Sequence, residues 1–155
     1  FLVCLEVFMA KQTEFPFQVQ GYELDSFQHV NNAVYLNYME AARWKFFEEI
    51  GVLDYLLKER IYPVVIETTI RYLRELKMHD QCVIETSWST DMDYIVAEHS
   101  LYSLTGTRRK AAKATVKMLL VSQERLIYSL SEPMKRRISG ICGEECTENA
   151  IACCL

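Results

Sequence analysis

The chain has 155 residues, of which 50% are hydrophobic and 25% charged, and its formal net charge is −4. These values are ordinary for one globular domain with its own core. They argue against nucleic acid as the main partner, because such binding needs clustered Lys and Arg to neutralise phosphates. No stretch approaches the roughly 20 apolar residues that cross a bilayer, so we expect no membrane span and a cytoplasmic protein.

The two ends of the chain are expected to lie outside the fold. Met9 resembles a natural start, so residues 1–14 are interpreted as a leader or read-through segment and residues 1–8 as non-native. Four of the six cysteines crowd into residues 139–155, for which we predict a disordered tail with reduced thiols. One domain should therefore occupy residues 15–138. The cysteine spacing lacks the paired CxxC of zinc sites and the histidines form no ligand pattern, so we expect no metal.

The first predicted element is a strand. Residues 15–22 alternate apolar and polar side chains, which is typical of a half-buried strand. This strand would deliver Asp25 to a short polar loop that precedes a helix.

The second predicted element is a long helix. Between Tyr35 and Ile50, apolar residues recur at spacings of four, three, four and four. Asn31 and Asn32 are both good N-cap residues, and Gly51 is a common stop signal. We therefore expect the helix to run from Asn31 or Asn32 to Gly51.

The remainder of the chain is predicted to form a short helix and a sheet. Residues 52–59 favour the helix, and alternation then predicts four strands joined by short turns, over residues 64–73, 82–88, 94–104 and 112–120. Cys82 fits a small buried apolar side chain on one of them. Because sequential strands joined by short turns pair antiparallel, one helix with about five strands indicates an α+β layer architecture.

The segment from Tyr22 to Tyr35, YELDSFQHVNNAVY, carries a family resemblance. It resembles the hot-dog fold acyl-CoA thioesterases of the 4-hydroxybenzoyl-CoA thioesterase-like family, in which an acid is followed by a loop rich in Gly, His, Val and Asn and then by Tyr. The resemblance implies a long central helix wrapped by the sheet. It also implies hydrolysis of an acyl thioester in fatty acid metabolism, without metal or redox cofactor, with coenzyme A or acyl carrier protein as part of the substrate. Gln28 departs from the pattern, since many relatives have Gly there.

Asp25 is the principal catalytic candidate. The resemblance makes it the general base or nucleophile toward the thioester carbonyl, which the N–H groups at the start of the helix would polarise. Asn32 and Tyr35 are the further catalytic candidates on this motif. The alternative for Asp25 is that its side chain caps the turn, which is the commonest use of Asp in such a loop.

Five residues are candidates for substrate binding. His29, Asn31 and Ala33 belong to the loop and the helix start, while Arg71 and Arg74 can meet the phosphates of coenzyme A or the acidic surface of a carrier protein. The alternatives are a packing or capping role for His29 and solvated cross-strand ion pairs for the arginines.

The resemblance also bears on partners and on competing functions. Members of the family form their active site where two subunits meet, which implies a homodimer or homotetramer. Two other functions stay open, a non-catalytic module that binds or senses acyl thioesters and a hot-dog hydratase or dehydratase, because a fold does not fix a reaction. The sequence leaves the acyl chain length open.

Overall fold

A computed structural model describes residues 11–140 of the chain. The elements, in chain order, are β1 (Lys11–Gln18), a 3-10 turn η1 (Gly21–Glu23), α1 (Val34–Glu49), α2 (Leu53–Lys58), β2 (Tyr62–Tyr72), β3 (Gln81–Asp91), β4 (Tyr94–Ser103), β5 (Arg109–Val121) and α3 (Glu132–Ser139). The prediction of one long helix, a short second helix and five strands is confirmed.

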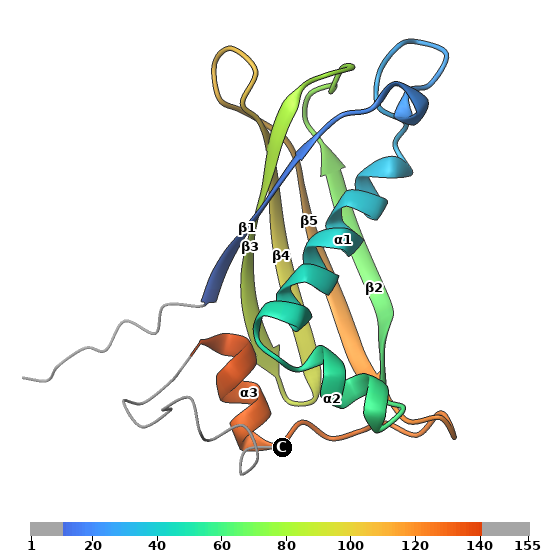
Figure 1. The fold of residues 1–155 in the computed structure, drawn as a ribbon, viewed down its shortest axis with the longest axis vertical. Helices are drawn as coiled ribbons and strands as arrows, with labels where there is room; N and C mark the ends of the chain where they lie inside the picture. Colours follow the sequence, from blue (N-terminus) through green and yellow to red (C-terminus); the bar gives the residue numbers. More distant parts are fainter. Residues whose placement is uncertain (1–10, 141–155) are drawn as a thin grey trace, which may run out of the picture.

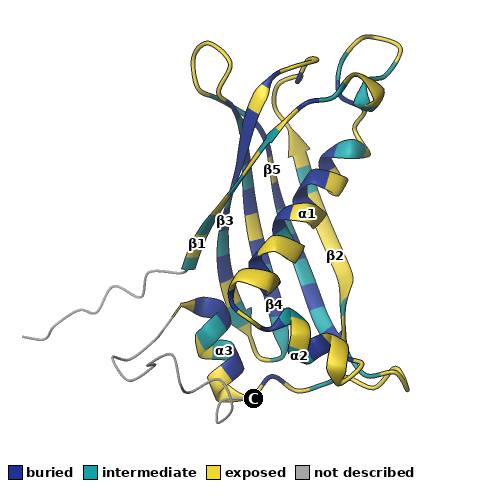
Figure 2. Cartoon of the chain, viewed as in Figure 1, coloured by how far each residue is buried: buried dark blue, intermediate teal, exposed yellow. Residues whose placement is uncertain are grey.

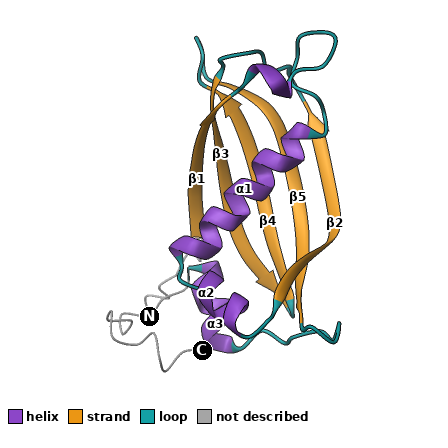
Figure 3. Cartoon of the chain, turned by 45° about the vertical axis from the view of Figure 1, so that its right-hand side comes forward, coloured by secondary structure: helices purple, strands orange, loops and turns teal. Residues whose placement is uncertain are grey.

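The five strands form one antiparallel sheet with α1 on its inner face (Figure 1). The strand order is β1-β3-β4-β5-β2, so β2 crosses to the far edge while the later strands pair with their chain neighbours. Figure 3 shows the sheet curving around α1, with β2 beside the helix and not beneath it. The α+β architecture is therefore as predicted.

The core lies between α1 and the inner face of the sheet. Alternation along the strands turns Trp88, Ala97 and Ala112 toward the helix, and all three are fully buried. The ring of Trp88 stacks on that of Phe46 with the centroids 3.8 Å apart. The small alanines let the helix approach the sheet, and the aromatic stack fixes its position, since core side chains interdigitate with few voids.

Strand β2 is the uncovered part of the sheet (Figure 2). Nearly all of its residues are exposed, among them Val64, Val65 and Ile66, which retain 41%, 44% and 49% of their accessible surface. In residues 11–140, no helix is both long and apolar enough to cross a membrane.

The structure corrects three of the predicted boundaries. β1 begins at Lys11, so residues 11–14 belong to the sheet and not to a leader. It ends at Gln18, and η1 separates it from Asp25. Helix α1 begins at Val34 rather than after an Asn cap. The expectations for residues 1–10 and 141–155 lie outside the described residues.

Helix α3 was not predicted. Ser131 caps its start by accepting a hydrogen bond from the N–H of Met134, and Pro133 stands in its first turn. Gly140 ends it in a left-handed conformation, φ 74°. A Cβ at Gly140 would lie 2.7 Å from the Cβ of Lys11, so the last described residue is packed against the first.

Two adjacent leucines of α2 test where the core lies. Leu56 is 1% exposed and Leu57 is 58% exposed. We expect Leu56→Ala to lower the free energy of unfolding by about 2–5 kcal/mol, because it opens a cavity in the core. Leu57→Ala is the matched control and should change it by less than about 0.5 kcal/mol. Urea denaturation measures both values, and equal losses would contradict this account of the core.

Candidate active site

The candidate acid lies in a closed loop between η1 and α1. Leu24 and Val30 form an isolated β-bridge at the base of the loop. Above it, the N–H of Asp25 donates to the carbonyl oxygen of His29 at 2.7 Å, and the N–H of Gln28 donates to that of Asp25 at 3.1 Å. Gln28 has φ 64°, so a residue other than Gly occupies a left-handed position here, at some cost in strain.

The two carboxylate oxygens of Asp25 have different surroundings. Oδ1 accepts the N–H of Phe27 at 2.8 Å and that of His29 at 3.3 Å, so it shapes the turn. Oδ2 has no hydrogen-bond partner within residues 11–140. The turn-capping interpretation therefore holds for one oxygen, while the other stays available to a ligand or to water. The side chain is half-buried.

Main-chain hydrogen bonds fix the loop against its neighbours. The N–H of Val30 donates to the carbonyl oxygen of Leu76 at 2.9 Å, which ties the loop to the segment that follows β2. The N–H of Asn31 donates to the carbonyl oxygen of Glu23 at 2.9 Å. The acid and the start of α1 are thus parts of one hydrogen-bonded unit.

The start of α1 leaves main-chain donors free. The side chain of Asn31 accepts the N–H of Ala33 at 2.9 Å, and its carbonyl oxygen accepts the N–H of Val34 at 2.9 Å. The N–H groups of Asn32 and Tyr35 have no acceptor among the residues that the structure describes. Unpaired N–H groups of a first helical turn can stabilise negative charge on a carbonyl oxygen.

The other two catalytic candidates have mainly structural contacts. Tyr35 is buried and packs edge-on against the ring of Tyr72 at 5.1 Å, and its hydroxyl lies 3.5 Å from the carbonyl oxygen of Arg74. Burial raises the pKa of Tyr35 to about 12, which makes it a poor proton donor near neutral pH. The carbonyl oxygen of Asn32 accepts the hydroxyl of Tyr72 at 2.9 Å, while its side chain is exposed.

The substrate-binding candidates do not all lie together. His29 and Asn31 lie in the loop, and Ala33 is the residue directly before α1. Arg74 lies two residues after the end of β2, and its carbonyl oxygen lies beside the hydroxyl of Tyr35. Arg71 instead lines an open hollow of about 410 Å³ with Glu98 and Lys113, on the sheet face that points away from α1.

One carboxylate beside the loop was missed by the sequence analysis. Oε2 of Glu23 accepts the hydroxyl of Tyr38 at 2.5 Å and the main-chain N–H of Gln20 at 2.7 Å. Tyr38 lies in α1, fifteen residues further along the chain. No local pattern connects the two positions, because only the chain reversal between η1 and α1 brings them together.

A second cluster, also missed, lies under the middle of α1. The side chain of His99 is buried, with Nδ1 2.8 Å from Oγ1 of Thr86 and Nε2 3.5 Å from Nη1 of Arg43. Because Arg can only donate, Nε2 must accept and Nδ1 must carry the proton. Burial and, secondly, the Arg43 guanidinium lower the pKa of His99 to about 3.

Cys82 is 1% exposed on β3 with a free thiol, so its predicted role as a small buried side chain is confirmed. Within the described range 11–140, no group of three His, Cys, Asp or Glu side chains is arranged to hold a metal ion.

The chain was compared with known families and proteins. Residues 19–138 match the model of the thioesterase-like superfamily. A 67-residue segment, 43% of this chain, is 39% identical to the long-chain acyl-CoA thioesterase FadM of Escherichia coli and spans 51% of it. A 98-residue segment, 62% of this chain, is 34% identical to the chloroplastic acyl-acyl carrier protein thioesterase ATL3 of Arabidopsis thaliana and spans 52% of it. The chain thus spans about half the length of these curated relatives.

Solved structures share the fold at lower identity. A variant of 4-hydroxybenzoyl-CoA thioesterase, solved with 4-hydroxybenzoyl-CoA, superposes with a TM-score of 0.77 at 14% identity. The superposition covers 84% of this chain and 100% of that one. The expected hot-dog fold is therefore confirmed.

The buried imidazole should make stability depend on pH. Unfolded His99 regains its ordinary pKa of about 6.5, so below that pH the unfolded chain binds a proton that the folded chain binds only near pH 3. The contribution of neutral His99 to the free energy of unfolding is complete above pH 6.5. It is lost, by up to about 1.4 kcal/mol per pH unit, as the pH falls toward 3. We expect the free energy of unfolding of the wild type to fall between pH 7 and pH 5. In His99→Gln this fall should be smaller by about 2 kcal/mol, as measured by urea denaturation at both pH values. Equal falls would contradict this assignment.

Proposed function

Because the chain belongs to the thioesterase-like superfamily, we propose that it hydrolyses the acyl thioester of coenzyme A or of an acyl carrier protein, releasing a carboxylic acid and a thiol. The observation that carries the proposal is the free Oδ2 of Asp25 on a loop hydrogen-bonded to the start of α1. The named relatives, a long-chain acyl-CoA thioesterase and an acyl-acyl carrier protein thioesterase, support this substrate class and a role in fatty acid metabolism.

In the proposed reaction, Asp25 drives the attack on the thioester carbonyl. As a general base, Oδ2 takes a proton from water while the water oxygen bonds to the carbonyl carbon. As a nucleophile, Oδ2 itself bonds to that carbon, and water then hydrolyses the acyl intermediate. In both cases the oxyanion would lie at the free N–H groups of Asn32 and Tyr35, and the C–S bond breaks as the thiolate leaves and takes a proton.

The reaction as proposed needs no metal or redox cofactor. The chain itself supplies both the base or nucleophile and the donors to the oxyanion. The dipole of α1 stabilises negative charge at this end of the helix by roughly 0.3–1 kcal/mol. Coenzyme A or the carrier protein enters as part of the substrate. His29, Asn31 and Ala33 would border the acyl group, and Arg74 would face the phosphates of the carrier, whereas Arg71 lies on the other face of the sheet.

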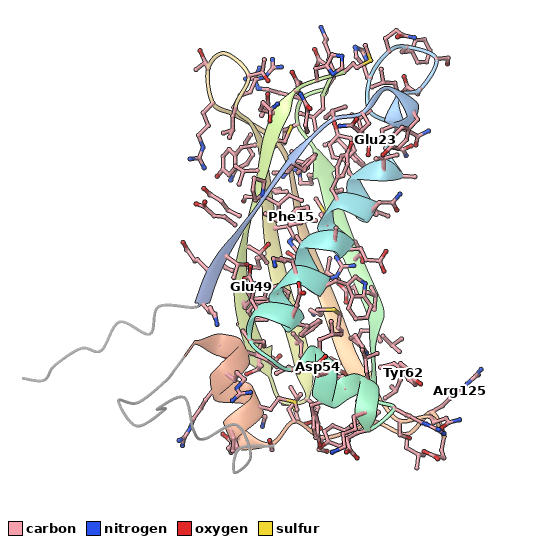
Figure 4. The ribbon with its side chains drawn as sticks, in the orientation of Figure 1. Phe15, Glu23, Glu49, Asp54, Tyr62 and Arg125 are labelled. Carbon is pink, nitrogen blue, oxygen red and sulfur yellow. The ribbon has the colours of Figure 1, made fainter. Side chains whose placement is uncertain are left out.

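Asp25→Asn tests this assignment with little change in structure. The amide oxygen of Asn can accept the same N–H bonds as Oδ1, so the loop should keep its shape while the basic oxygen is lost. We expect kcat on acyl-CoA thioesters to fall by roughly 10²–10⁴-fold with substrate binding retained. Free acid should be detected directly, since six cysteines would react with a thiol dye. Asp54→Asn, at the opposite end of the molecule (Figure 4), is the control that should leave kcat unchanged.

The same assay separates the other two functions. A sensor would bind acyl thioesters without turnover in the wild type and would tolerate Asp25→Asn. A hydratase would add water to the double bond of an enoyl thioester and leave its C–S bond intact. Either outcome would contradict thioester hydrolysis.

We further propose that the protein is a homodimer paired through β2. The outer edge of β2 has no strand neighbour within residues 11–140, and exposed apolar side chains line it. Such an edge is a template for another strand. Antiparallel pairing of two copies about Thr69 would set Glu67 opposite Arg71 of a second copy, twice by symmetry, so the charges of β2 complement themselves.

Reversing one charge tests this pairing. Arg71→Glu would place two carboxylates opposite each other, and we expect the dimer dissociation constant to rise roughly tenfold or more. The swap Glu67→Arg with Arg71→Glu should restore dimerisation, and Lys113→Glu on neighbouring β5 is the control. Sedimentation equilibrium measures all four proteins. A monomeric wild type would refute the dimer, and a dimer indifferent to Arg71→Glu would refute the register.

We also propose that the protein works in the cytoplasm. The free buried thiol of Cys82 is consistent with the reducing conditions of that compartment.

A further inference from the structure

Glu23 connects three parts of the candidate active site. Its carbonyl oxygen accepts the N–H of Asn31, three residues before α1 begins, at 2.9 Å. Its carboxylate accepts the hydroxyl of Tyr38, in the second turn of α1, at 2.5 Å. Two residues after it, Asp25 opens the loop. Figure 4 shows Glu23 at the end of the molecule where α1 begins.

Tyr38 is held so that its hydroxyl has little freedom. The residue is 7% exposed, and its ring lies against that of Phe17 on β1 with the centroids 4.1 Å apart. Burial and, secondly, the Glu23 carboxylate raise the pKa of Tyr38, so the phenol stays protonated and acts as a donor. The same oxygen of Glu23 also accepts the N–H of Gln20, which fixes the carboxylate from the other side.

These contacts link the attacking group to the oxyanion donors. Asp25 lies in the loop that follows η1, whereas the free N–H groups of Asn32 and Tyr35 lie at the start of α1. Besides the main chain between them, the Glu23 and Tyr38 side chains provide the direct side-chain connection between η1 and α1 in the described part of the chain. A change of about 1 Å between two such groups can cost roughly a hundredfold in rate.

We propose that Glu23 and Tyr38 are positioning residues, which set the distance between the Asp25 loop and the first turn of α1 for the reaction. The inference rests on the proposed thioesterase function. Neither residue needs to exchange a proton with substrate, because Asp25 supplies the base or nucleophile and the main chain supplies the oxyanion donors.

Four variants test this role in steady-state hydrolysis of acyl-CoA. Tyr38→Phe removes only the hydroxyl, and Glu23→Ala removes its acceptor. We expect each to lower kcat by roughly 10–100-fold with KM changed by less than about threefold. Glu23→Gln keeps an oxygen that can accept the same bonds and should retain kcat within about fivefold. Tyr55→Phe removes another tyrosine hydroxyl, 2.8 Å from that of Tyr128 at the far end of the molecule, and should leave kcat unchanged.

The double variant Glu23→Ala with Tyr38→Phe adds a second criterion. If both residues act through their shared hydrogen bond, the kcat of the double variant should equal that of the slower single variant. The two fold-losses of the single variants should not multiply. Melting temperatures of all the variants show which of them stay folded at the assay temperature.

Each contrary result has a distinct meaning. Wild-type kcat in folded Tyr38→Phe, or multiplied losses in the double variant, would overturn the positioning role while leaving the thioesterase in place. A loss in Glu23→Gln as large as that in Asp25→Asn would make Glu23 a reacting group and overturn it also. An inactive wild type would refute the proposed function and this inference with it.

Discussion

The constraint on which the whole structure depends is that α1 must be covered and that the sheet covers it on one side only. The Trp88 and Phe46 rings stack beneath the last turn of the helix, and the buried alanines of β4 and β5 allow it to approach. This packing fixes the axis of α1, and the start of the helix then lies beside the segment that follows β1. The same packing leaves β2 and the flank of α1 that bears Trp44 uncovered. Site and open edge are both consequences of one packing arrangement.

At the start of α1, most main-chain N–H groups near Asp25 have an acceptor, and this makes the exceptions informative. Asp25 and Val30 are tied down through their main-chain N–H groups, while the side chain of Asn31 satisfies the first turn. Polar groups without partners are costly in a folded protein unless water or a ligand reaches them. A free carboxylate oxygen and free helix donors on one rigid unit therefore form a preorganised site for a substrate that carries a polarisable carbonyl.

Alternation and helical spacing in the sequence were sufficient for the α+β architecture, because both patterns report burial on one face. These patterns gave no signal where polar residues occupy inward-facing positions. Thr13, in a polar stretch that gave no strand signal, faces inward on β1 and accepts the indole N–H of Trp88 at 2.9 Å. Helix α3 is short and largely polar, although Ser131 and Gly140 are ordinary capping signals that mark its two ends. The cluster around His99 left no local pattern in the sequence, since its partners come from β3 and α1.

The packing of Gly140 against Lys11 has a consequence for the connectivity of the fold. The described fold begins and ends at one place, beside the end of β1 that lies away from the Asp25 loop. Folds whose first and last elements meet in this way commonly tolerate circular permutation, because a short linker can join the two elements without spanning the surface. New ends could then open at the exposed turn of residues 105–107 between β4 and β5. In such a permuted chain the order of the elements along the sequence would change, while their packing in the fold would stay the same.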